Sequence, residues 1–129
     1  MKRAILIISL FLILIVISLL EEILLTQNLE ELYNKSVSLL NNVEITENVN
    51  STQILTEIEE LKNFWDTSEN YICIVINHIY IEEVGEQLTK IKTLSEQNKK
   101  EEIIVEINLL IYYAKSYQHL IIPTIQNIL

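Results

Sequence analysis

The chain has 129 residues, half of them apolar, and a net charge of -9. Its length suits a single domain, and its acidic balance without a basic stripe excludes nucleic acid as an expected partner. A single Gly and a single Pro argue against a turn-rich β fold, and one Gly cannot build a Gly-rich phosphate-binding loop.

The first apolar segment extends from Ala4 to Leu20 and contains no charged residue. As a helix it is roughly 25 Å long, near the lower limit for crossing a hydrocarbon core of about 30 Å. Two basic residues precede it and two glutamates follow it, so the positive-inside rule places residues 1–3 in the cytoplasm and residues 21–129 outside. The sequence therefore predicts a single-pass protein of the cell membrane, anchored by residues 4–20.

Cleavage of this segment as a secretory signal peptide is the alternative prediction, because signal peptides have the same basic start and apolar stretch. Val16-Ile17-Ser18 could serve as a cleavage site. The apolar run continues beyond it, however, and the usual small-residue pattern is missing. We therefore expect an uncleaved signal anchor.

Beyond the anchor, small and apolar residues recur at spacings of four and three, which is typical of one helical stripe in a bundle or coiled coil. The stripe consists of Leu25, Leu29, Leu32, Ser36, Leu39 and Val43. The anchor helix is thus expected to continue into the domain. A polar stretch from Asn41 to Thr52, rich in Asn, Ser and Thr, predicts the first connection.

The next apolar stripe begins with Ile54, Ile58, Leu61 and Trp65. Asp66-Thr67-Ser68-Glu69 resembles a capping box, so the helix either breaks there or continues through it. A further stripe comprises Tyr71, Ile74, His78, Ile81, Gly85, Leu88 and Ile91. The β-branched run from Tyr71 to Ile76 favours a strand by propensity alone, but it has no partner strand, and we predict a helix.

The most regular stripe follows a polar link from Ser95 to Lys100. It consists of Ile103, Ile107, Leu110, Ala114, Tyr117 and Ile121. Pro123 should end this helix at about Ile121 or Ile122. Three amphipathic helices with short polar links predict an all-α fold, in which a transmembrane helix continues into an antiparallel three-helix bundle.

His78 is the first candidate for a functional site, because the stripe places it in the core and Glu82 follows one turn later. A buried histidine needs a hydrogen-bond partner or has a lowered pKa, and histidine titrates in a range suited to proton sensing. One hypothesis is a buried polar sensor site formed by His78, Glu82 and Trp65. The other, which we favour, is a structural histidine satisfied by the next helix.

Other chemistry has little support in the sequence. The lone Cys73 cannot form an internal disulfide, and we interpret it as a small buried apolar residue. It lies five positions from His78, on a different helical face, so the two do not form a nucleophile and its base. His119 has no acid at a matching spacing. We therefore expect no metal, no cofactor and no enzymatic activity.

Several short features together resemble an uncharacterised family of small membrane-anchored proteins of clostridia and related spore-forming bacteria. They are the basic and then apolar start, Trp65, Asn77-His78 followed by Glu82 and Glu83, and the closing Asn127-Ile128-Leu129. The resemblance implies a membrane-anchored helical protein, and it implies no activity, because the family has none assigned.

The predicted function is that of an extracytoplasmic interaction or structural module of unknown process. Its partner is expected to be another membrane or envelope protein, or a second copy. The contact is expected to use the acidic surface or an exposed apolar stripe. The alternative is an extracytoplasmic sensor that binds a small ligand or a proton in the bundle near His78.

Overall fold

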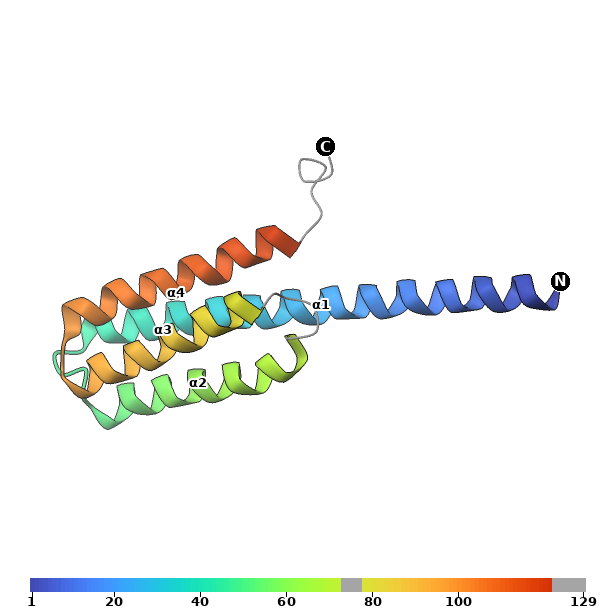
Figure 1. Cartoon of the computed structure of the whole chain (residues 1–129). Coiled ribbons are helices and arrows are strands. Elements are labelled where there is room, and N and C mark those ends of the chain that lie inside the picture. The colour runs from blue at the N-terminus through green and yellow to red at the C-terminus, as the bar shows by residue number, and fades with distance from the viewer. Residues whose placement is uncertain (73–77, 122–129) are drawn as a thin grey trace.

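The computed structural model describes residues 1–72 and 78–121, with all their side chains except those of Lys2, Tyr71, His78, Leu120 and Ile121. The described residues form four helices and no strand (Figure 1). The helices are α1 (Lys2–Ile45), α2 (Thr52–Ile72), α3 (His78–Glu96) and α4 (Lys100–Ile121). The all-α prediction is thereby confirmed.

The predicted count of three helices is corrected to four, because the segment from Ile54 to Ile91 forms both α2 and α3. α2 continues through Asp66 to Glu69, so the segment that resembles a capping box lies inside a helix. Ser68 in this segment is buried, and its hydroxyl donates to the backbone oxygen of Phe64, one turn earlier, at 2.9 Å. The predictions for Cys73, Ile74 and Pro123 concern residues outside the described part of the chain.

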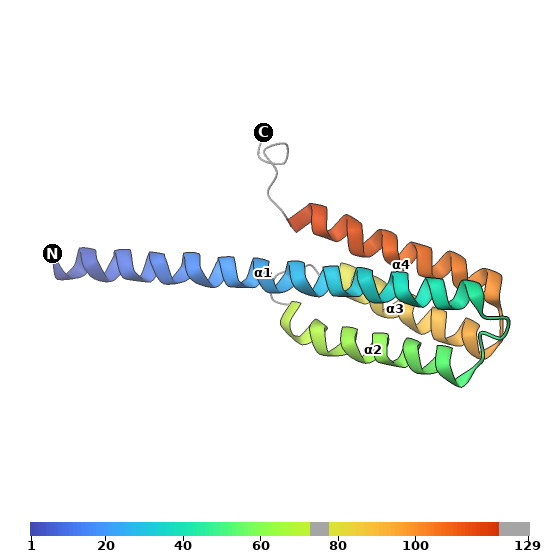
Figure 2. The same ribbon diagram turned by 180° about the vertical axis from the view of Figure 1, so that it is seen from behind.

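Each helix packs against its neighbours in the chain, and α4 also packs against α1. Two polar contacts fix the relation of α1 to α2: Asn42 donates to Glu57 at 2.8 Å, and the Ser68 hydroxyl lies 2.9 Å from the side-chain oxygen of Asn28. Later residues of α1 thus meet earlier residues of α2. Figure 2 shows from the opposite side that α2, α3 and α4 lie along the second half of α1.

The predicted stripes form the core. Every stripe residue whose side chain is described is buried, except Gly85, which is partly exposed. Trp65 is the largest fully buried side chain, with 1% of its surface exposed. Because each stripe faces the other helices, one apolar cluster joins all four.

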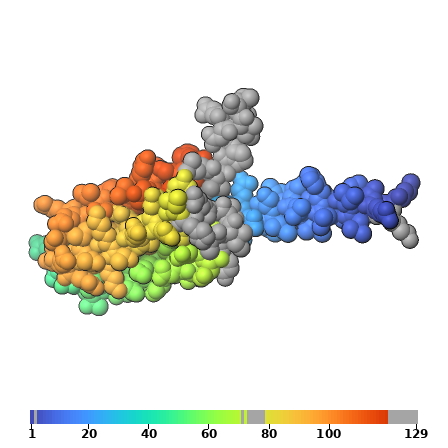
Figure 3. All heavy atoms as spheres, in the orientation of Figure 1, coloured from blue at the N-terminus to red at the C-terminus, as the bar shows by residue number. Residues whose placement is uncertain are grey.

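The first half of α1 projects beyond this core (Figure 3). It contains a described helical segment that is long and apolar enough to cross a membrane, and none of that segment is buried in the protein. Leu10, for example, has 58% of its surface exposed. The helix itself is continuous from Lys2 to Ile45, as the sequence predicts.

The end of the domain farthest from this projection is held by polar contacts between two connections. Asn98 has a positive φ of 55°, a conformation that Asn adopts more readily than most residues, and it closes the C-terminus of α3. Its side-chain oxygen accepts from the backbone nitrogens of Val49 at 2.9 Å and Asn50 at 3.3 Å. Lys100 donates to the backbone oxygens of Glu44 and Thr46, at the C-terminus of α1.

Candidate functional site

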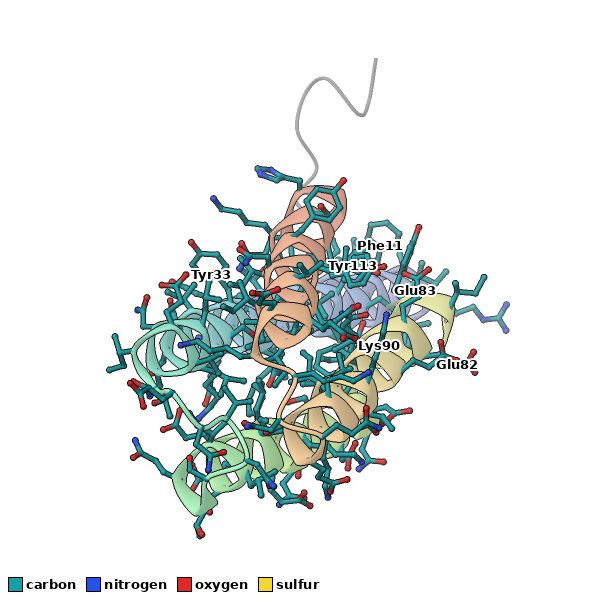
Figure 4. All side chains as sticks on the ribbon, turned by 90° about the vertical axis from the view of Figure 1, so that its left-hand side faces the viewer. Phe11, Tyr33, Glu82, Glu83, Lys90 and Tyr113 are labelled. Carbon is teal, nitrogen blue, oxygen red and sulfur yellow. The ribbon has the colours of Figure 1, made fainter. Side chains whose placement is uncertain are left out.

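The three residues of the predicted sensor site have different surroundings. Trp65 lies on α2 in the core, whereas Glu82 is exposed on the outer side of α3 (Figure 4). His78 is the first residue of α3, and its side chain lies outside the described part. The structure thus does not place the Glu82 carboxylate in the core beside the Trp65 indole.

Glu83, the neighbour of Glu82, faces α4 instead. The hydroxyl of Tyr117, which is 5% exposed, donates to the Glu83 carboxylate at 2.5 Å. The Tyr117 ring is 4.7 Å from that of Tyr80 and stacks on that of Tyr113 at 5.8 Å between centroids. Figure 4 shows Tyr113 and Glu83 on the side of α4 that faces α3.

Burial raises the pKa of Tyr117 far above its ordinary value, and the adjacent Glu83 carboxylate raises it further. Tyr117 therefore stays protonated at neutral pH and acts as a hydrogen-bond donor to Glu83. A tyrosine held neutral in this way is unsuited to act as a general base near pH 7. The cluster is best explained as a structural connection between α3 and α4.

A second polar cluster joins the same two helices, one turn after Glu83 on α3 and about three turns before Tyr117 on α4. Gln87 is buried and donates to the carboxylate and the backbone oxygen of Glu106, the latter at 2.9 Å. Lys90 pairs with the same carboxylate at 2.5 Å. Burial opposes ionisation of Glu106, but the hydrogen bonds from Lys90 and Gln87 outweigh it, so the pKa of Glu106 is below its ordinary value. Glu106 is therefore ionised at neutral pH and directed toward α3.

The exposed surface of α4 is apolar between its charged ends. Val105, Leu109 and Tyr112 have 65%, 36% and 63% of their surfaces exposed, and Asn108 lies among them. These four residues follow the spacing of a single helical face, and we call them the α4 outer face. An exposed apolar face of this kind is typical of an interaction surface.

The spacing of apolar residues in the sequence also indicates this face, but only the main stripe of the helix was predicted from it. The main stripe on α4 follows Ile103, Ile107, Leu110, Ala114 and Tyr117, and the outer residues follow a second series offset from it. Glu83 gave no such signal, because Glu82 and Glu83 both flank the buried stripe and the sequence does not distinguish them.

Among the described residues, no group of three or more His, Cys, Asp or Glu side chains is placed to hold a metal ion. Comparisons with known proteins found no matching family model, no matching curated protein and no matching solved structure. The family resemblance of the sequence therefore stays a prediction that rests on short motifs.

Proposed function

We propose that this protein is a membrane-anchored helical module that acts outside the cytoplasm through contacts with other protein surfaces, without catalysis. The observation that supports this most is the division of α1. Its first part is apolar and uncovered, whereas from Leu25 onward the same continuous helix supplies the core of the domain. A continuous helix would hold the domain directly on the membrane surface.

The orientation follows from the charges around the apolar segment. Lys2 and Arg3 would remain in the cytoplasm, and the domain after Leu20 would be exported, folded as an antiparallel bundle. The first core residue, Leu25, is five positions beyond Leu20, or about 7–8 Å along a helix. The domain would therefore stand next to the lipid head groups.

The polar clusters support an interaction role over a catalytic one. The carboxylates of Glu83 and Glu106 are used to connect α3 to α4, through Tyr117 in one case and through Gln87 and Lys90 in the other. The α4 outer face, in contrast, presents apolar side chains to solvent. Apolar side chains can stabilise a protein contact by their burial but offer no chemistry.

The test is crosslinking of the full-length protein in its native membrane, followed by mass spectrometry of the captured species, with protease added to the outer side. We expect an intact N-terminal segment, a domain cleaved only from outside, and specific capture of one membrane protein or of a second copy. A protein that is shortened after Ser18 and released from the membrane would contradict the anchor. An anchored domain that captures nothing would contradict the interaction role.

The variant with Lys2→Glu and Arg3→Glu is the matched control for orientation, because it reverses the flanking charges and leaves the apolar segment unchanged. We expect a reduced fraction of externally accessible domain in this variant. An unchanged fraction would show that these two residues do not determine the orientation.

A sensor of a small ligand or a proton near His78 is the second candidate, favoured by one observation. The indole nitrogen of Trp65 is buried and has no hydrogen-bond partner among the described residues. A bound group with an acceptor atom could remove the cost of an unpaired indole N–H, about 1–3 kcal/mol.

Trp65 is the only tryptophan, so its fluorescence reports on this candidate directly. We expect, if sensing occurs, a transition between about pH 5 and 8 that disappears in His78→Gln. An identical titration in the wild type and in His78→Gln would exclude proton sensing by this histidine.

A further inference from the structure

The composition of α4 sets it apart from the other helices of the domain. Between residues 103 and 113 it contains only two polar residues, Glu106 and Asn108. A helix that is apolar nearly all round is normally covered on all sides. Among the described helices, however, α4 packs against α1 and α3 and not against α2.

The remaining side of α4 is the α4 outer face, and it has no charge. Glu106, the single charged residue in this stretch, is turned toward α3 by Gln87 and Lys90. The nearest exposed charges on α4 are the pair Glu101 and Glu102 at one end and Lys115 at the other. The Lys115 ammonium lies 5.6 Å from the centre of the Tyr33 ring on α1, away from the outer face.

The described residues of α2 and α3 do not form such a face. Every residue of α2 whose side chain is described as exposed is polar, with Thr56, Glu60 and Asn63 among them. On α3, exposed Glu82, Glu86 and Lys90 provide charge along the helix. Ile79 on α3 is exposed as well, but charged residues follow it along that helix. Among the described residues of α2, α3 and α4, the run of exposed apolar side chains without charge is therefore on α4.

We propose that the α4 outer face binds a second copy of this chain in the same membrane, as a two-fold dimer. This inference rests on the proposed function, because it needs the anchor to hold both copies in one orientation. The two α4 helices then run in the same direction. Val105, Leu109 and Tyr112 of one copy each lie close to the same residue of the other copy.

Charge distinguishes the second copy from other occupants. Without Lys2 and Arg3 the net charge of -9 becomes -11 for residues 21–129, so two copies repel one another through most of their surfaces. The α4 outer face is an uncharged surface on which they can touch, with the carboxylates of Glu101 and Glu102 at its end. A basic partner would be drawn to the acidic surfaces instead. Lipid is a poor occupant because the end of α4 nearest the anchor is Ile121, and Tyr112 lies nine residues farther along the helix, away from the membrane.

The small size of the face is compatible with pairing in a membrane. Four residues cover less area than a stable dimer of soluble proteins needs. Anchoring in one membrane confines both copies to a layer in a fixed orientation, which raises their effective concentration and lowers the affinity that pairing requires.

Disulfide crosslinking of the full-length protein in its membrane tests the proposal. Tyr112→Cys and Val105→Cys, each in a Cys73→Ser background, place single thiols at the two ends of the face. Asn63→Cys, on the exposed side of α2, is the matched control. We expect about tenfold or more faster formation of covalent dimer at 112 and 105 than at 63, since only the face would hold the thiols together.

A charge variant supplies an independent measurement. Val105→Glu places a carboxylate in the contact, whereas Asn63→Glu adds the same charge on α2. We expect about tenfold or more weaker dimerisation for Val105→Glu only, measured by fluorescence energy transfer between labelled copies in vesicles.

Crosslinking at 112 and 105 no faster than at 63 would overturn the dimer, as would capture of a different protein by Tyr112→Cys. An anchored, externally accessible monomer would refute self-association and leave the anchor intact. A protein released from the membrane would instead refute the proposed function.

Discussion

Both halves of α1 are rich in leucine, but the leucines of the two halves have opposite surroundings. Leu10 and Leu12 in the first half are exposed by 58% and 57%, whereas Leu29 and Leu32 in the second half are fully buried. The difference lies in the intervening residues. The first half is apolar around the whole helix, but in the second half polar residues such as Gln27 and Glu30 separate the apolar ones.

This contrast shows that the periodicity of leucine, more than its frequency, indicates what will cover a helix. A helix with a stripe needs other helices on one side, and a helix that is apolar all round needs an apolar environment on every side. Within the domain, α4 approaches the second case between residues 103 and 113, which is why its uncovered side supports an interaction.

The largest expected effect comes from charging the first half. Leu10→Arg with Leu14→Arg should prevent stable insertion, because two arginines near the centre of a membrane helix cost roughly 5–7 kcal/mol. Resistance to alkaline extraction from membranes measures insertion. Leu10→Ala with Leu14→Ala is the control and should remain inserted. If the double arginine variant resists extraction as the wild type does, the first half of α1 is not a membrane anchor.

Truncation of a leucine should give opposite results in the two halves. Leu32→Ala should lower the free energy of unfolding of the domain by about 2–5 kcal/mol, since it leaves a cavity in the core. Leu12→Ala should leave that free energy unchanged within about 0.5 kcal/mol. Urea unfolding of both full-length variants in the same detergent, followed by circular dichroism, makes the comparison. Equal losses would mean that the two halves share one environment.

The sequence correctly predicted that α1 is apolar all round in its first half and packs by one stripe in its second, because periodicity depends only on the helix itself. All the described stripe residues of α1 are buried. They include Ser36, whose hydroxyl donates to the backbone oxygen of Leu32 at 2.7 Å. The connection between α2 and α3 was not predicted. A break was considered only at Asp66 to Glu69, because connections are normally polar and the residues after Tyr71 are largely apolar.

The candidate site depends on contacts between helices, which spacing along one helix does not contain. Trp65 was correctly placed in the core by its stripe. Glu82 was chosen for its spacing from His78, yet the carboxylate that faces another helix is that of Glu83. Which of two adjacent glutamates turns inward depends on the position of Tyr117 on α4, and spacing along α3 contains no information about it.

Acid should weaken the domain and leave the first half of α1 unaffected, since residues 4–20 contain no titratable side chain. The pKa of Glu106 is below its ordinary value of 4.5, so ionised Glu106 stabilises the folded domain above pH 4.5. That stabilisation, roughly 1–2 kcal/mol, is lost as the pH falls below 4.5 through the lowered value. Urea unfolding between pH 6 and 3 should show a shallower decline in Glu106→Gln than in the wild type. Glu82→Gln, at an exposed position, should retain the wild-type slope, and parallel curves for Glu106→Gln would refute the assignment.

The smallest expected effect concerns the C-terminus of α1, where the Lys100 side chain binds the last backbone carbonyls. The Lys100 ammonium donates to the backbone oxygens of Glu44 at 2.8 Å and Thr46 at 2.7 Å, where the negative end of the helix dipole favours a cation. Lys100→Met keeps the length of the side chain and removes the charge, so it should lower the free energy of unfolding by about 1 kcal/mol. Amide hydrogen exchange in the last turn of α1 should accelerate accordingly, while exchange around Leu32 should follow only the change in global stability.

Lys99→Met is the matched control, because the neighbouring Lys99 makes a surface ion pair with Glu102 at 3.5 Å and should change stability by less than about 0.5 kcal/mol. Equal effects of the two substitutions would mean that the far end of α1 is held by its packing alone, as the stripe from Leu25 to Val43 would allow.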